Sequence, residues 1–164
     1  MKKVIIIAVI IIAVVNISYA FEVDGFKDGM SKEMVLEKAR SYNFSKIVEG
    51  DDGPLVLYDW PELSIFRFYA LSFSDNKLVT LAKRFKPSMS NYILLFKELS
   101  EKYGNEVYCY AQTKLSSSGE DKDIGCNWNN GKELISIKYS VFPSNDDLYV
   151  FYSVVDKYIP RKVK

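Results

Sequence analysis

The chain has 164 residues, of which 22 are Lys or Arg, 21 are Asp or Glu and none is His. This near balance of charge argues against a nucleic-acid-binding protein, because such proteins usually concentrate a basic excess on one face. Without histidine, the Ser-His-Asp and Cys-His arrangements of nucleophilic enzymes are excluded. Aromatic residues make up 15% of the chain and fall mainly in strand-like segments, so we expect a globular, β-rich protein.

The first 20 residues have the pattern of a secretory signal peptide. A basic tripeptide opens the chain, residues 4–15 are apolar, and Ser18 and Ala20 form a small-x-small exit that would be cleaved before Phe21. The alternative is an uncleaved membrane anchor, but a bilayer span needs about 20 apolar residues, and this run is interrupted at Asn16. No Cys lies near the cleavage point, which argues against a lipoprotein.

Cleavage would remove Lys2 and Lys3 and no acid, so 22 basic residues become 20 against 21 acidic ones, a net charge of about −1. The remaining length suits one compact domain or two small fused ones. We expect a periplasmic or secreted protein with no stable membrane span after the signal is removed. We divide the chain into the signal peptide 1–20, a first half 21–86, a second half 87–155 and a frayed basic tail 156–164.

Cys109 and Cys126 are the two cysteines of the chain. An even pair in an oxidising compartment predicts a disulfide, with two free buried thiols as the alternative. Both residues lie in alternating segments and are equally far from a tip near residues 117–118, which would place them opposite each other in a hairpin. Two thiols without any His fall short of the four ligands of a structural zinc site, so we expect no metal and no other cofactor.

The first half predicts a helix followed by strands. Ser31 is a good N-cap, and Glu33 places negative charge in the first turn of a helix that runs to about residue 41. Four apolar side chains share one side of this helix: Met34, Val35, Ala39 and Tyr42. The period then becomes alternating, which predicts strands at 46–49, 55–58, 63–73 and 78–85, with turns at 50–54 and 74–77.

The second half repeats this order. Ser90 is the expected N-cap of a helix that ends at Gly104, where a left-handed C-cap would suit glycine. Its apolar stripe consists of Tyr92, Leu95, Phe96, Leu99 and Tyr103. Strands are predicted at 106–114, 124–128, 133–141 and 148–155, with a polar, mobile loop at 116–123 and a type I′ hairpin turn at Asn130-Gly131.

These elements predict an α+β fold built as a pseudo-tandem repeat. Each half would contain one helix followed by about four antiparallel strands, with the helices packed on one side of a curved sheet. Met30-Ser31 aligns with Met89-Ser90 at an offset of 59 residues. The matched element order supports duplication better than these few identities do.

Two short motifs carry a resemblance to a known family. Gly29-Met30-Ser31-Lys32-Glu33-Met34-Val35 is similar to the helix entry of small exported modules of the SmpA/OmlA (BamE) type. Phe73-Ser74-Asp75-Asn76-Lys77-Leu78 resembles their hairpin. The tandem arrangement looks like the fold of the β-lactamase-inhibitor proteins. The resemblance implies this fold and a protein-binding habit, although the chain lacks the lipidation Cys of the BamE type and has a second half.

Catalytic chemistry has little support in the sequence. Paired carboxylates could still catalyse hydrolysis, and the adjacent acids are Asp51 with Asp52 and Asp146 with Asp147. Both pairs lie in turn-like segments, where acids usually serve solubility and turn hydrogen bonds. We therefore expect no enzymatic activity and keep a small carboxylate-dependent hydrolase as an alternative.

Aromatic residues at alternate strand positions form the candidate binding face: Phe66, Phe68, Tyr108, Tyr110, Tyr149 and Phe151. Tyr and Phe often anchor protein interfaces, whereas the simpler interpretation is core packing beneath the helices. Tyr108 and Tyr110 are the best candidates for exposure, because they point away from Val107, Cys109 and Ala111. We expect a protein that binds another exported or envelope protein without catalysis. A structural protein associated with peptidoglycan or membrane is a further alternative.

Overall fold

The computed structural model describes residues 19–49, 53–59, 67–104, 107–116, 119–142 and 145–155. Several predictions fall outside the described residues. These are the body of the signal peptide up to residue 18, the turn residues 50–52 with Asp51 and Asp52, the candidate residue Phe66 and the basic tail 156–164.

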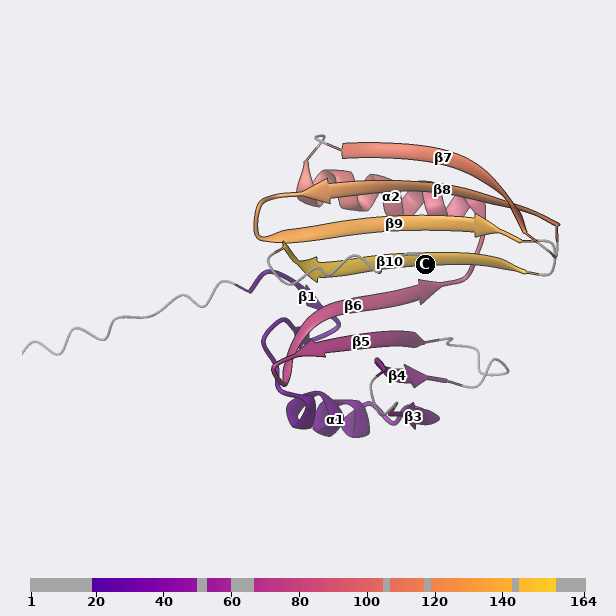
Figure 1. The fold of residues 1–164 in the computed structure, drawn as a ribbon. Helices are drawn as coiled ribbons and strands as arrows, with labels where there is room; N and C mark the ends of the chain where they lie inside the picture. The colour runs from indigo at the N-terminus through magenta and orange to yellow at the C-terminus, as the bar shows by residue number, and fades with distance from the viewer. Residues whose placement is uncertain are drawn as a thin grey trace, which may run out of the picture.

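Most of the described chain is antiparallel β-sheet (Figure 1). A short hairpin, β1 with β2, precedes one eight-stranded sheet of order β3-β4-β5-β6-β10-β9-β8-β7. The elements are β1 (Glu22–Val23), β2 (Phe26–Lys27), α1 (Lys32–Ser41), β3 (Lys46–Val48), β4 (Leu55–Tyr58), β5 (Phe68–Ser74), β6 (Lys77–Phe85), α2 (Met89–Tyr103), β7 (Val107–Ser116), β8 (Gly119–Asn129), β9 (Glu133–Val141) and β10 (Asp146–Val154).

The predicted fold class, a pseudo-tandem repeat of helix-plus-sheet units, was wrong. Strands β3 to β10 form one continuous sheet, and strands far outweigh the two helices of the described residues. The halves merge where β6 pairs with β10, from Leu148 opposite Phe85 to Ser153 opposite Thr80. Sequence periodicity indicates local elements, but it carries no information on this pairing between distant strands, which joins the strands of both halves without the predicted repeat.

The N-terminal elements follow their local signals closely. Ser31 caps α1, since its Oγ accepts from the Met34 amide at 3.3 Å. Asp75 and Asn76 both have positive φ, 51° and 57°, which is the requirement of the type I′ turn that joins twisted strands such as β5 and β6. Within α1, Val35 and Ala39 are fully buried, whereas Met34 is 53% exposed and does not join the predicted apolar side.

Helix α2 begins two residues earlier than predicted. Its N-cap is Ser88, whose Oγ accepts from the Asn91 amide at 3.1 Å, and not Ser90. The helix ends at Gly104 as expected, and Gly104 takes a φ of 90° that other residues rarely adopt, but its ψ of −179° is extended and not that of the predicted left-handed cap. The predicted stripe faces the core: Tyr92 and Leu99 are buried, and Leu95, Phe96 and Tyr103 pack partly buried against it.

The segment predicted as a polar loop is part of a long hairpin. Strands β7 and β8 pair from Val107 opposite Trp128 to Ser116 opposite Gly119. Cross-strand pairs such as Gln112 with Asp123, whose side chains are hydrogen-bonded at 3.0 Å, stabilise strands whose composition alone favours a loop. The Asn130-Gly131 turn is present, but only Gly131 has positive φ, and the Asn130 side chain instead accepts from the amides of Lys132 and Glu133.

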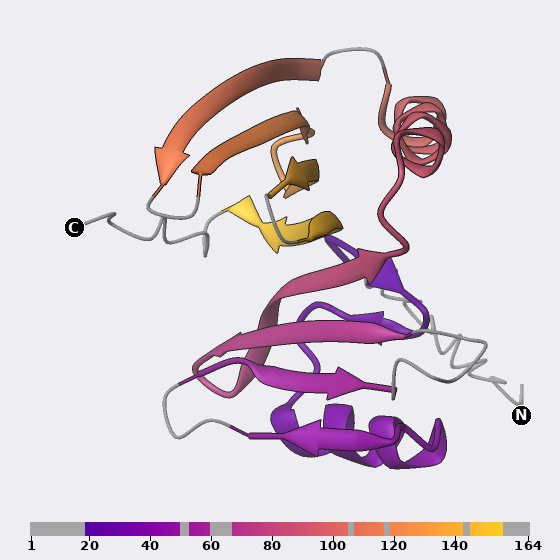
Figure 2. The ribbon, with the colours of Figure 1, turned by 90° about the vertical axis from the view of Figure 1, so that its right-hand side faces the viewer.

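The core lies on one face of the sheet. Alternate residues of the central strands are fully buried there, including Leu71, Leu81, Val150 and Ile137. Helix α2 covers the β8 and β9 side of this face, lying behind these strands in Figure 1 and to one side of them in Figure 2. Its Phe96 ring lies 5.7 Å from the Trp128 ring. Within the described part of the chain, no helix combines the length and apolar character needed to cross a bilayer.

Candidate functional site

The face of the sheet opposite to this core is called here the open face, because no described helix covers it. Side chains on a strand alternate between the two faces of the sheet, so the residues between the buried ones lie on the open face. Three of the predicted binding residues, Phe68, Tyr149 and Phe151, lie on this face and are half-buried. The structure therefore brings together one part of the predicted set, from strands β5 and β10.

Four rings on the open face form a continuous row, the aromatic row: Tyr58, Phe68, Tyr149 and Phe151. Tyr58 stacks on Phe68 at a centroid distance of 6.4 Å, Phe68 meets Tyr149 edge-on at 6.3 Å, and Tyr149 lies 5.7 Å from Phe151. The row crosses β6, which contributes Ala82 opposite Phe151. Ala82 is buried although it lies on the open face, so neighbouring side chains cover it.

Cations border the aromatic row. The Arg84 guanidinium lies 5.7 Å from the centre of the Tyr149 ring and is paired with the Asp147 carboxylate, and the Lys46 ammonium lies 5.8 Å from the Tyr58 ring. Burial raises the pKa of Tyr149, Asp147 raises it further, and Arg84 opposes both, so this phenol remains a neutral donor at ordinary pH. A half-buried row of rings with adjacent cations is typical of residues that anchor protein contacts.

A hollow of about 200 Å³ adjoins the row at Phe151. It is lined by Thr80, Asn127, Leu134, Ser136, Phe151 and Ser153. Its polar groups already bond to one another: Ser136 Oγ to Asn127 Oδ1 at 2.6 Å, and Thr80 Oγ1 to Ser153 Oγ at 3.2 Å. The hollow could receive one side chain of a partner without leaving these hydroxyls unpaired.

The remaining predicted binding residues do not join the row. Tyr108 and Tyr110 lie on the open face but on β7, and β8 and β9 separate them from Phe151. Tyr108 is 70% exposed, as expected. Tyr110 folds its ring over Gly125, where a Cβ would approach to 2.7 Å, so it covers the sheet and is only half-buried. Phe66 lies outside the described residues.

Sequence reasoning missed Tyr58 and the hollow. Alternation in β4 places Tyr58 with Val56 opposite the buried Leu55 and Leu57, and this signal was available from the sequence. The hollow could not have been predicted in the same way, because Thr80, Ser136 and Ser153 meet only through the pairing of β6 and β9 with β10.

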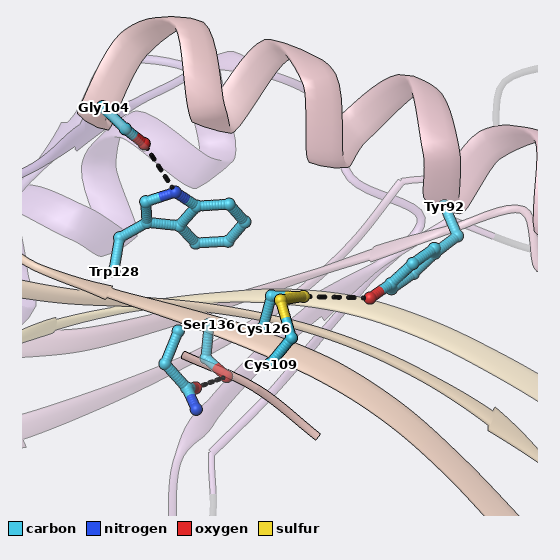
Figure 3. Close-up of a disulfide and its surroundings, with 7 residues drawn as sticks. Tyr92, Gly104, Cys109, Cys126, Trp128 and Ser136 are labelled. Carbon is cyan, nitrogen blue, oxygen red and sulfur yellow. Dashed lines mark hydrogen bonds between the residues drawn. A yellow bond between two sulfur atoms is a disulfide. The ribbon is translucent and has the colours of Figure 1, made fainter. Parts of the chain in front are cut away.

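The predicted disulfide is confirmed. Cys109 and Cys126 lie directly opposite each other in the β7–β8 ladder and are bonded. Figure 3 shows Tyr92 of α2 reaching the bond, with its hydroxyl 3.4 Å from Cys126 Sγ. In the same view the Trp128 indole donates to the Gly104 carbonyl oxygen at 3.1 Å. The disulfide thus joins the edge strand β7 to β8, the strand whose Cys126 and Trp128 contact α2 and its C-cap.

A larger cavity, about 560 Å³, lies near the end of β6 and is bordered by several cations. Most of its charges are paired within the protein: Lys83 Nζ lies 2.7 Å from Asp24 Oδ2, Arg67 Nε lies 2.6 Å from Asp59 Oδ2, and Arg84 is paired with Asp147. Burial acts to raise the pKa of Asp24, but the hydrogen bonds from Lys83 and Tyr69 outweigh it and lower the pKa. We therefore assign these groups a structural role, since a new anion would have to displace existing partners.

The two described acids of the carboxylate pairs singled out from the sequence, Asp146 and Asp147, each have a partner. Asp146 accepts from the Tyr139 hydroxyl at 2.7 Å, and Asp147 is paired with Arg84, so each adjacent acid has a structural partner. No group of three or more potential metal ligands occurs among the described residues. Comparison of the chain with profiles of protein families, with curated proteins and with solved structures finds no match.

Proposed function

We propose that this chain is an exported, non-catalytic protein-binding module of the cell envelope or extracellular space, and that it binds its partner with the open face. The observation that carries this proposal is the aromatic row of Tyr58, Phe68, Tyr149 and Phe151. These rings remain half-buried on a face that no described helix covers.

The chemistry of the row favours a protein partner. Tyr and Phe bury a large area at low cost in side-chain entropy, and Arg84 adds a cation that is already oriented by Asp147. The hollow beside Phe151 offers a recess for a single side chain, as the pockets around interface anchors do. The likeness of the Gly29–Val35 and Phe73–Leu78 motifs to BamE-type modules also implies a binding habit.

Export is supported by the cysteines as well as by the signal-like start of the sequence. Cys109 and Cys126 form a disulfide, and structural disulfides persist mainly in oxidising compartments. The partner is therefore expected among exported or envelope proteins.

The test compares two matched surface variants of the full exported chain. One replaces Phe68, Tyr149 and Phe151 on the open face with Ser. The control replaces Ile93 and Leu94 with Ser, which are 57% and 59% exposed on α2. Each protein is used to capture partners from an exported fraction, and every captured protein is then purified and titrated against both variants.

We expect a purified partner whose affinity falls at least fivefold for the open-face variant and is unchanged for the α2 variant, since an interface anchor contributes 1 kcal/mol or more. Equal affinity for both variants would refute the open face as the binding site. Sedimentation of the native chain with peptidoglycan or lipid vesicles alone, without a protein partner, would replace the proposal with an envelope-associated structural role.

A further inference from the structure

The residue that the expected signal cleavage would expose is already anchored in the fold. Phe21 is 2% exposed, and its ring lies 6.2 Å from the Tyr152 ring. The backbone nitrogen of Phe21 donates to Asp28 Oδ1 at 3.2 Å, and the Asp28 amide donates back to the Phe21 carbonyl oxygen at 3.3 Å. First residues of a domain usually fray unless they are held in this way.

A second carboxylate, which lines the same cavity as Phe21, has one oxygen without a hydrogen-bond partner among the described residues. Glu133 is 6% exposed; its Oε1 accepts from Asn130 Nδ2 at 3.0 Å, and its Oε2 is buried without a hydrogen-bond partner among the described residues. Glu133 lines a cavity of about 300 Å³ together with Tyr19, Ala20, Phe21, Glu22, Lys102 and Tyr103. A buried carboxylate oxygen without a partner costs about 1–3 kcal/mol or more.

From this arrangement we propose that the cavity is a binding site for the α-ammonium group of a chain that begins at Phe21. An amide nitrogen carries one N–H, which Asp28 already accepts. An α-ammonium group has three N–H donors and a positive charge. It can therefore keep the hydrogen bond to Asp28 and donate a second one to Glu133 Oε2. The occupant is thus a segment of the chain itself, produced by cleavage of the peptide bond between Ala20 and Phe21.

Burial and neighbouring charges together disfavour the ionised form of Glu133, so an added cation would stabilise it. Burial raises the pKa of Glu133, the Asn130 amide and Lys102 lower it, and Asp28 raises it again, with a net rise. Glu22 also lines the cavity, and Tyr152 lies close to Glu133. Lys102 contributes a positive charge without a hydrogen bond to Oε2, which leaves that oxygen for the ammonium group.

The interaction with the α-ammonium group would make the stability of the folded chain fall as the pH rises. Two carboxylates raise the pKa of the α-amino group in the folded chain above its ordinary value of about 7.7–8.0. The stabilisation is therefore complete below that ordinary pKa and is lost as the pH rises through the folded-state pKa. A chain that keeps residues before Phe21 has no ammonium at this nitrogen and lacks this dependence.

The proposal rests on the export proposed above, but its test uses purified protein and needs no partner. A carrier fusion cleaved directly before Phe21 gives the native start, and a fusion cleaved before Ala20 gives a chain longer by one residue. The pKa of the α-amino group is measured in both by NMR titration. The same pair is prepared with Glu133→Gln and, as a control, with Glu120→Gln, an exposed acid on β8.

We expect the α-amino pKa of the Phe21 chain to exceed that of the Ala20 chain by about one unit, a tenfold change in proton affinity. Glu133→Gln should reduce this difference and Glu120→Gln should not. Equal pKa values in the two chains would overturn the proposal, as would a difference that Glu133→Gln leaves unchanged. Either result leaves the open-face binding experiment unaffected, so the two proposals fail separately.

Discussion

Removing the disulfide should cost about 3 kcal/mol of the free energy of unfolding. The bond closes a loop of 18 residues, counting both cysteines, because Cys109 and Cys126 are 17 positions apart. In the chain-entropy model, a loop of that size restricts the unfolded chain by about 3 kcal/mol at 25 °C. Typical domains have a net stability of 5–15 kcal/mol, so the loss in a Cys109→Ala/Cys126→Ala variant should be easy to measure.

Urea unfolding followed by tryptophan fluorescence provides the assay, because Trp128, one of the two tryptophans of the chain, is 1% exposed and packs on Phe96. The disulfide acts mainly on the unfolded chain, so the variant should also expose more surface on unfolding and show a larger m-value. Reductant should shift the native protein and leave the variant unchanged. A loss below about 1 kcal/mol, with an unchanged m-value, would refute the entropic argument.

Three further predictions concern the helices and a buried ion pair. Leu99→Ala should cost about 2–5 kcal/mol in urea unfolding, because Leu99 is 6% exposed, whereas Leu94→Ala on the same helix, at 59%, should stay within about 0.5 kcal/mol of the native protein. Ser31→Ala should lose about 1 kcal/mol with the N-cap bond; no change in denaturant midpoint would contradict the cap. Burial acts to raise the pKa of Asp59, but the Arg67 pair and the hydrogen bonds from Ser45 together outweigh it and lower the pKa. The pair therefore stabilises the fold above the ordinary Asp pKa, and this stability is lost as the pH falls through the folded-state value. Acid unfolding of Asp59→Asn should show a weaker pH dependence than the native protein, and an identical acid profile would reject the assignment.

The sequence was informative where a local rule determines the structure. The Ser31 cap, the positive φ of Gly104 and the Cys109–Cys126 register each depend on residues within a turn or a single hairpin. Three of the four rings of the aromatic row were in the predicted set for the same reason, since alternation determines the face on which Phe68 lies in β5 and Tyr149 and Phe151 lie in β10.

Other features depend on contacts between distant segments. The pairing of β6 with β10, which corrects the repeat prediction, joins residues more than 60 positions apart and leaves no periodic signal. The polar residues of β8 form a strand because β7 and β9 pair with it on both sides, although their composition favours a loop. Helix α2 starts at Ser88 and not at Ser90, a shift within the usual uncertainty of helix ends.

The junction between β6 and β10 also sets an order of events for a chain that emerges from its N-terminus. Strand β6 is complete at Phe85, yet its second neighbour begins only at Asp146. Throughout the intervening synthesis or translocation, one side of β6 presents unpaired amides and carbonyls, the kind of edge that captures foreign strands. The last described strand, β10, therefore completes the sheet. A chain truncated before Asp146 would leave β6 with an unpaired edge that is prone to aggregation.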